Sequence, residues 1–124
     1  MTTPPDREAP AVSSYPLVTL TQRADFLRAA QARRQGAQGF LLQARRREED
    51  GAIRIGYTCS KKIGNAVARN RAKRRLREIA RLVLPGLARP GWDYVLVGRP
   101  GATAERDFAL LIEDLRKALR RVHE

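Results

Sequence analysis

The spacing of apolar side chains predicts six secondary-structure elements and an α+β fold. Helical periods of apolar residues cover three stretches, at residues 20–36, 65–84 and 108–122. Short apolar or alternating runs typical of strands cover residues 39–46, 53–59 and 93–97. The order helix, strand, strand, helix, strand, helix predicts a single-domain α-β sandwich in which three helices pack on a small mixed sheet.

The first predicted helix carries one apolar face. Leu20, Ala24 and Leu27 recur at i, i+4 and i+7, so we expect them to point into the core. Thr19 or Thr21 is the candidate N-cap, because a hydroxyl oxygen can accept a hydrogen bond from a free backbone N–H of the first turn.

Turn and breaker residues set the expected connections. Pro85-Gly86 is expected to end the middle helix, and Thr103 is the candidate N-cap of the last one. Asp50-Gly51 predicts a turn, so the first two strands are expected to pair as an antiparallel hairpin. The second and third strands flank the middle helix and can lie parallel, joined by a crossover that handedness statistics alone make right-handed.

The composition is that of one small, strongly basic domain. The chain has 124 residues, with 25 Lys and Arg against 13 Asp and Glu, a formal net charge of +12 and 43% hydrophobic residues. That hydrophobic fraction is enough for a core, and the charge favours nucleic acid, an anionic membrane surface or an acidic protein as partner. Residues 1–16 hold four prolines and few bulky apolar groups. We therefore expect a flexible tail at 1–16 and one folded domain at 17–124.

The sequence favours a cytoplasmic location. No stretch approaches 18 consecutive apolar residues, and the first ten residues include Asp6 and Glu8 rather than a basic segment followed by an apolar one. We therefore expect neither a membrane span nor a secretory signal. The single cysteine, Cys59, has no partner for a disulfide within the chain, which favours a reducing compartment.

The positive charge is concentrated around the start of the middle helix. Between Lys61 and Arg81 there are nine basic residues and one acid, Glu78. At about 100° per residue, five polar side chains fan across one flank of this helix: Asn70, Lys73, Arg74, Arg77 and Arg81. Like charges at this spacing repel, and a phosphate backbone offsets the repulsion because binding releases its counterions. The alternatives are a solvated surface helix and a membrane-adsorbed helix, and the small Ala and Leu side chains of the apolar face argue against the second.

Two features beside this flank add to the hypothesis of nucleic-acid binding. Asn70 stands between two arginines, and its amide can donate and accept together, which suits a ribose hydroxyl or a base edge. The alternative is that Asn70 only satisfies backbone groups near the helix start. Lys61 and Lys62 precede the helix, and a helix N-terminus flanked by lysines favours a phosphate group.

No catalytic constellation is visible in the sequence. His123, the only histidine, is expected either to favour the C-terminus of the last helix or to be frayed. Cys59 continues the alternation of its strand and is expected to be a small buried hydrophobe. The acids at residues 48–50 could hold a cation, with a solvated loop as the alternative. We therefore expect no catalytic residue and no metal site in the protein itself.

The segment from Arg54 to Glu78 resembles the signature of the bacterial ribonuclease P protein subunit. The shared elements are a strand ending in Ser-Lys-Lys (60–62), a Gly-Asn-Ala step (64–66) and an Arg-Asn-Arg motif (69–71) that continues into a basic helix. The similarity in element order and length extends over about residues 17–123.

The resemblance implies an accessory role beside a catalytic RNA. It implies that the RNA subunit removes the 5′ leader of precursor tRNA with magnesium held mainly by the RNA, and that the protein is a monomer in a 1:1 complex with it. The implied RNA-binding residues are Lys61, Lys62, Arg69, Asn70, Arg71, Lys73, Arg74 and Arg77. Phe26, Leu41 and Gln43 are the implied lining of a groove for the single-stranded leader, although Ala30 and Gln43 stand where aromatic residues are common in the family. It also implies a left-handed crossover, which we adopt over the statistical expectation.

Three other functions are compatible with a basic domain. A structural RNA-binding module such as a small ribosomal protein would bind RNA stably without affecting tRNA maturation. A stand-alone nuclease would cleave RNA without an RNA subunit, which the missing catalytic constellation disfavours. A DNA-binding protein would prefer duplex DNA over structured RNA in competition.

Overall fold

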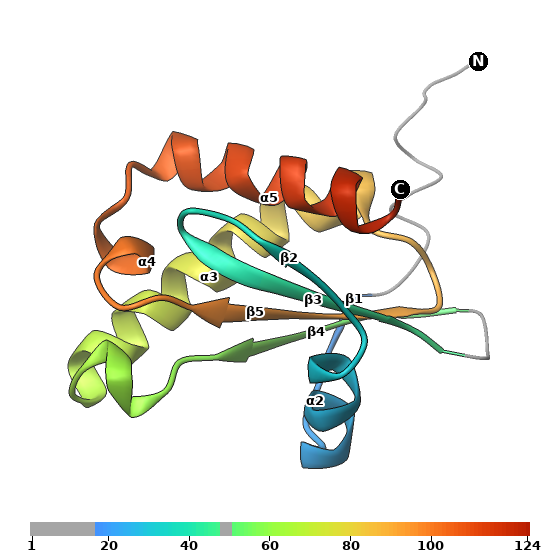
Figure 1. Cartoon of the computed structure of the whole chain (residues 1–124), viewed down its shortest axis with the longest axis horizontal. Coiled ribbons are helices and arrows are strands. Elements are labelled where there is room, and N and C mark those ends of the chain that lie inside the picture. The colour runs from blue at the N-terminus through green and yellow to red at the C-terminus, as the bar shows by residue number, and fades with distance from the viewer. Residues whose placement is uncertain (1–16, 48–50) are drawn as a thin grey trace.

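The computed structural model describes residues 17–47 and 51–124, which form one sheet with helices on both faces (Figure 1). The predicted α+β fold is confirmed. The predicted tail at 1–16 and the acids at 48–50 lie outside the described residues. The strands are β1 (Leu17–Thr19), β2 (Arg33–Gly36), β3 (Phe40–Arg46), β4 (Ile53–Thr58) and β5 (Trp92–Gly98). The helices are α2 (Arg23–Ala30), the 3-10 turn η1 (Lys61–Ile63), α3 (Ala66–Leu87), α4 (Ala102–Glu105) and α5 (Phe108–Val122).

The strand order is β1-β4-β5-β3-β2, with β5 in the centre. β5 pairs parallel to β4 and antiparallel to β3. The expected hairpin of β3 with β4 is therefore wrong. β5 separates them because it is the most apolar strand, buried from Trp92 to Leu96, and a strand covered on both faces belongs in the middle of a sheet. The parallel pairing of β4 and β5 around α3 is as predicted, and the hand of this crossover stays a prediction.

The two faces of the sheet are covered unequally. Figure 1 shows α3 and α5 on one face and the short α2 on the other. The larger core lies under α3 and α5, where Leu42, Tyr94 and Leu96 of the sheet pack against residues such as Leu76 and Leu115 of the helices. A smaller cluster of Leu20, Ala29 and Val95 lies under α2. Because side chains alternate along a strand, one residue step decides which of the two layers a side chain joins.

The first helix differs from its prediction at both ends and in its buried face. It ends at Ala30, and residues 33–36 form the edge strand β2. Its N-cap is Gln22, which makes no side-chain capping bond, so neither threonine caps it. Asp25 and Ala29 are buried, whereas Leu27 is 51% exposed. The spacing of apolar residues predicted the wrong buried face, because the helix has only eight residues and contacts the sheet through an ion pair as well as through apolar side chains.

The other helices also differ from prediction at their ends. α3 continues through Pro85 to Leu87, because proline in the last turn removes one hydrogen bond while Leu84 and Leu87 stay packed on the core. Asp107 caps α5 by accepting a hydrogen bond from the backbone N–H of Leu110. Thr103, the predicted cap, is instead buried in α4, where its hydroxyl donates to the carbonyl of Gly39.

Candidate nucleic-acid interface

The chain turns sharply between β4 and α3, and this turn places the basic residues. Gly64 has φ +142°, a conformation that residues with a side chain rarely adopt, and a Cβ there would also lie 3.0 Å from the Cβ of Ala68. Asn65 then caps α3, its side-chain oxygen accepting a hydrogen bond from the backbone N–H of Ala68 at 2.9 Å. Gly64 and Asn65 of the motif therefore shape the backbone: they form the turn and the N-cap that begin α3 shortly after the exposed Lys61 and Lys62.

α3 presents its polar flank to solvent, and we call this surface the α3 ridge. Its buried stripe runs from Ala72 through Leu76 and Ile79 to Val83, close to the predicted one. The ridge consists of the eight residues predicted to bind RNA. Six of them are exposed and Arg69 and Lys73 are half-buried; the exposed ones are Lys61, Lys62, Asn70, Arg71, Arg74 and Arg77. The eight residues therefore extend from η1 to the middle of α3.

The contacts of single residues separate binding candidates from structural ones. Within residues 17–47 and 51–124, Asn70 and Arg74 have no side-chain hydrogen bond or ion pair, so Asn70 does not satisfy local backbone as the alternative held. Arg77 lies over the ring of Tyr57, 5.5 Å from its centroid. Arg75 points inward and donates to the carbonyls of Thr103 and Arg106, at 3.0 and 2.7 Å. Arg81 pairs with Glu78.

The three residues predicted to line a groove share the sheet face that α2 covers. Phe26 is half-buried and packs on the cluster of Leu20, Ala29 and Val95. Its ring lies so close to Gly56 that a Cβ there would be 2.5 Å from Cε1 of Phe26. Leu41 and Gln43 lie on β3 beside this cluster, and Gln43 is only 9% exposed. Phe26 and Leu41 thus offer more accessible surface to a ligand than Gln43 does.

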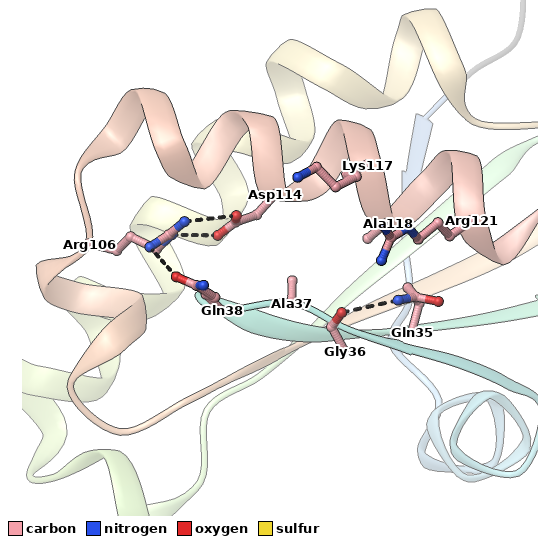
Figure 2. Close-up of a pocket in the computed structure, with 9 residues that line it drawn as sticks. All are labelled: Gln35, Gly36, Ala37, Gln38, Arg106, Asp114, Lys117, Ala118 and Arg121. Atoms are coloured by element: carbon pink, nitrogen blue, oxygen red, sulfur yellow. Dashed lines mark hydrogen bonds and ion pairs between the residues drawn. The ribbon is translucent and has the colours of Figure 1, made fainter.

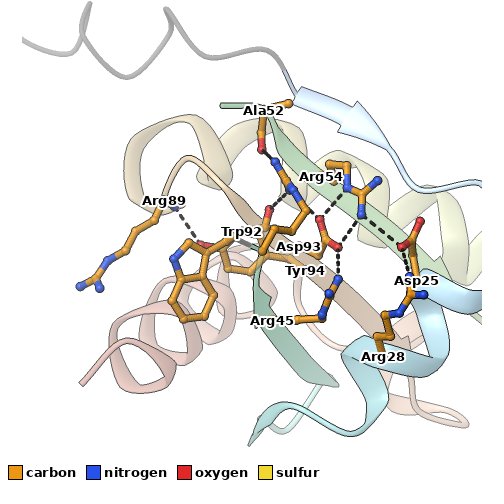
Figure 3. Close-up of polar contacts among 10 residues, drawn as sticks. Asp25, Arg28, Arg45, Ala52, Arg54, Arg89, Trp92, Asp93 and Tyr94 are labelled. Atoms are coloured by element: carbon orange, nitrogen blue, oxygen red, sulfur yellow. Dashed lines mark hydrogen bonds and ion pairs between the residues drawn. The ribbon is translucent and has the colours of Figure 1, made fainter. Parts of the chain in front are cut away.

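An ion-pair network that the sequence reasoning missed holds α2 to the sheet (Figure 3). Asp93 is fully buried and accepts hydrogen bonds from Arg54 at 2.7 Å through both oxygens and from Arg47 at 2.7 Å. Burial raises the pKa of Asp93, but the hydrogen bonds from Arg54 and Arg47 outweigh it and hold the pKa below its usual value. Arg54 also reaches Asp25 of α2 at 3.3 Å. The signal for this network was one carboxylate inside an otherwise apolar strand.

Comparison with known proteins identifies the family. Residues 17–123 match the sequence model of the family described as Ribonuclease P. This chain belongs to the ribonuclease P protein family. The ribonuclease P protein component of Ruegeria pomeroyi is 63% identical over 92% of this chain and 95% of its own length. That of Caulobacter vibrioides is 52% identical over 81% of this chain and 67% of its own length.

Solved structures of ribonuclease P proteins share the fold. The protein from Thermotoga maritima superposes with a TM-score of 0.70 at 30% identity, over 83% of this chain and 96% of that one. A mutant of the Staphylococcus aureus protein gives a TM-score of 0.71 at 23% identity, over 93% of each chain, which shows the fold alone. The resemblance drawn from the motif is therefore confirmed at the level of family and fold.

The remaining reactive side chains of this ribonuclease P protein are partly buried against its core. Cys59, predicted to be a buried strand residue, is half-buried just after β4 and packs on the larger cluster, and burial raises the pKa of its thiol. His123 is not frayed: its Nε2 lies 2.7 Å from the Tyr94 hydroxyl and its ring meets the Trp92 ring edge-on, with centroids 4.4 Å apart. Burial, and then the positive charges of Arg89 and Arg33, lower the pKa of His123 to about 4. His123 is therefore neutral at pH 7 and does not favour the helix C-terminus through charge.

The described part of the chain offers no cage for a metal ion. Within residues 17–47 and 51–124, no three His, Cys, Asp or Glu side chains gather where they could hold one. Among the same residues, no helix is long and apolar enough to cross a membrane.

A polar hollow of about 310 Å³ lies between the β2–β3 turn and α5 (Figure 2). Arg106 crosses it, pairing with Asp114 at 2.7 Å and donating to the side-chain oxygen of Gln38 at 2.8 Å. Asp114 also accepts from the backbone N–H of Gly39 at 3.2 Å. These contacts engage the charged groups at this end of the hollow with one another, so they fasten the turn to α5.

Proposed function

We propose that this chain is the accessory protein of a ribonucleoprotein endoribonuclease that removes the 5′ leader from precursor tRNA. It binds the catalytic ribonuclease P RNA in a 1:1 complex, and the RNA carries out the hydrolysis. The observation that carries the proposal is the α3 ridge: its motif residues follow one another from η1 to the middle of α3, with most of their charge exposed.

The physical case for RNA rests on unpaired charge. Arg71 and Arg74 of the ridge have no ion-pair partner in the described part of the chain, and Glu78 is engaged by Arg81. Each phosphate that such a side chain neutralises releases condensed counterions, which makes binding favourable and dependent on salt. Arginine adds a planar fork of N–H groups that matches phosphate oxygens. Asn70 supplies a donor and an acceptor for a ribose or a base edge between these cations.

The leader is assigned to the face covered by α2. The half-buried ring of Phe26 offers one stacking surface, and base stacking on an aromatic ring contributes on the order of 1–3 kcal/mol. Leu41 adds apolar contact beside it, and Gln43 adds a largely covered amide. Ala30 provides no second ring on α2. We therefore assign leader binding mainly to Phe26, Leu41 and the neighbouring cations.

Magnesium supplies the charge that stabilises the attacking and leaving oxygens, and we assign it to the RNA. The described residues provide no carboxylate cluster that fits this ion. The work of this chain is to bind and orient: its ridge neutralises phosphates of the folded RNA, and its α2 face holds the substrate segment outside the cleavage site.

Substitution of one ridge residue tests the RNA interface. Arg74→Ala removes an exposed charge without removing a contact inside the described protein. We expect it to weaken binding to a transcribed bacterial ribonuclease P RNA and to reduce the slope of log K against log salt by about one ion. Arg116→Ala is the matched control, because it removes the same charge from the exposed side of α5, where Arg116 pairs with Glu113. An unchanged slope for Arg74→Ala, equal to that of Arg116→Ala, would contradict the ridge assignment.

A further inference from the structure

A second basic surface lies at the end of the sheet opposite to the α3 ridge. It is a pocket of about 780 Å³. Its lining residues are Ala32, Arg33, Ala44, Arg45, Arg46, Arg89, Pro90, Trp92 and His123. Four of them are arginines, and no carboxylate is among the lining residues in the described ranges. Figure 3 includes three of them, Arg45, Arg89 and Trp92.

The topology separates this pocket from the ridge. β4 and β5 are parallel, with Arg54 opposite Asp93 at one end and Thr58 opposite Val97 at the other. Trp92 stands at the first end, whereas Lys61 follows the second. α3 runs back between them, and its end at Leu87 lies 17 positions after Asn70, which is about 25 Å at about 1.5 Å per residue. One phosphate group cannot contact both surfaces.

Two of the four arginines already serve the fold. Arg33 donates to the carbonyl of Val122 at 2.7 Å and lies over the Trp92 ring, 5.4 Å from its centroid. Arg45 reaches the buried Asp93, its cross-strand partner on β5, at 3.5 Å, so its guanidinium lies on the α2 face of the sheet and not on the face of Trp92. The contacts of Arg33 fix the wall of the pocket and hold one guanidinium group in place.

The guanidinium groups of the other two arginines make no contact that stabilises the described part of the fold. Arg46 and Arg89 are exposed, and their guanidinium groups have no ion pair or hydrogen bond within residues 17–47 and 51–124. They converge on the pocket from the end of β3 and from the loop after α3. After burial, the positive charges of Arg89 and Arg33 also lower the pKa of His123, so the local potential is positive. Such a potential in a concave site attracts an anion.

We propose that this pocket binds a phosphate group of an RNA backbone and is a second RNA contact of the protein. The inference rests on the proposed function for the identity of the polyanion. Arg46 and Arg89 supply the free N–H donors, while Arg33 and Trp92 form the wall beside them. Because the two surfaces face opposite ends of the sheet, the pocket contacts a different segment of RNA from the one bound at the α3 ridge.

The test uses the full chain and a transcribed bacterial ribonuclease P RNA, alone and with precursor tRNA. The double variant Arg46→Ala/Arg89→Ala is expected to reduce the slope of log K against log salt by up to about two ions in at least one of the two complexes. Arg116→Ala/Lys117→Ala is the control, since it removes two exposed charges from α5 that line neither this pocket nor the adjoining hollow of Arg89 and His123. A slope equal to that of this control in both complexes overturns the proposal, even if Arg74→Ala still shows the ridge effect and the proposed function stands. No RNA binding by the unchanged protein would overturn both.

A second readout uses residues that already stand in the pocket. Trp92 and His123 are the only tryptophan and the only histidine of the chain. Saturation with RNA is expected to change Trp92 fluorescence in the unchanged protein and in Arg74→Ala, and to change it much less in the double variant. Inorganic phosphate serves as the probe for a free anion. A fluorescence response to phosphate with no response to RNA would show that the pocket takes a small anion, and it would overturn the RNA assignment.

Discussion

Protonation of His123 is expected to destabilise the fold below neutral pH. Its pKa falls from 6.5 to about 4 in the folded chain. A lowered pKa means that the folded state favours the neutral ring, so this stability is present above pH 6.5 and is lost as the pH falls toward 4. Linkage of these two values gives a loss of about 2 kcal/mol between pH 7 and pH 5, and about 3 kcal/mol in total.

The local contacts explain this penalty. The backbone N–H of Arg89 donates to the Tyr94 hydroxyl at 2.8 Å, which leaves the hydroxyl proton for Nε2 of His123. Nδ1 then carries the ring proton, and it is buried without a partner among the described residues. A second proton on the ring would turn Nε2 from an acceptor into a donor that faces the hydroxyl. It would also place a cation near Arg33 and Arg89.

The assay is urea unfolding at several pH values, followed by the fluorescence of Trp92. His123→Gln removes the titrating group and keeps a polar side chain beside Tyr94. The free energy of unfolding of the unchanged protein minus that of the variant should fall by about 2 kcal/mol from pH 7 to pH 5. The two proteins differ only at this residue, so the acids that titrate in both cancel in the difference. A difference that stays constant over this range would refute the assignment of the pH effect to His123.

Two further substitutions test how α2 and the sheet are held together. Gly56→Ala places a Cβ 2.5 Å from the Phe26 ring and should lower the free energy of unfolding by about 1–3 kcal/mol. Gly86→Ala is its control: a Cβ there meets no atom within 4 Å, so this variant should lose no stability. Equal free energies of unfolding for the two variants would contradict the close packing of Phe26 on β4. Asp93→Asn removes the buried carboxylate to which Arg47 and Arg54 both donate and should cost about 3–5 kcal/mol in urea unfolding. Glu113→Gln, in an exposed pair with Arg116, is its control and should change stability by less than about 1 kcal/mol.

The elements with strong periodicity were predictable from the sequence. The pattern located α3, α5 and the three longer strands because each buries a face of several residues, and the period of a long buried face is visible locally. The short edge strands β1 and β2 carry no such signal. Arg33 to Gly36 is polar throughout and becomes a strand only because β3 offers an unpaired edge.

The order of the strands in the sheet and the buried ion pairs could not be predicted from local sequence patterns. The turn signal at Asp50-Gly51 indicated where the chain reverses, but it could not show that β5 would lie between the two strands. The sequence pattern gave no sign that Arg47 and Arg54 bind Asp93, because Asp93 is about 40 residues away from them in the chain. The α3 ridge was predictable because all its residues lie in one segment. The pocket of Arg46 and Arg89 was not, since its residues come from four separate segments.

The most direct test of the proposed function is leader release from precursor tRNA. The full chain is added to a transcribed bacterial ribonuclease P RNA and a precursor tRNA with a 5′ leader, at magnesium too low for the RNA to act well alone. We expect cleavage at the mature 5′ end only when protein and RNA are both present, and a protein effect that grows with leader length. Tight binding of the RNA without any gain in cleavage would contradict it and would favour a purely structural RNA-binding module.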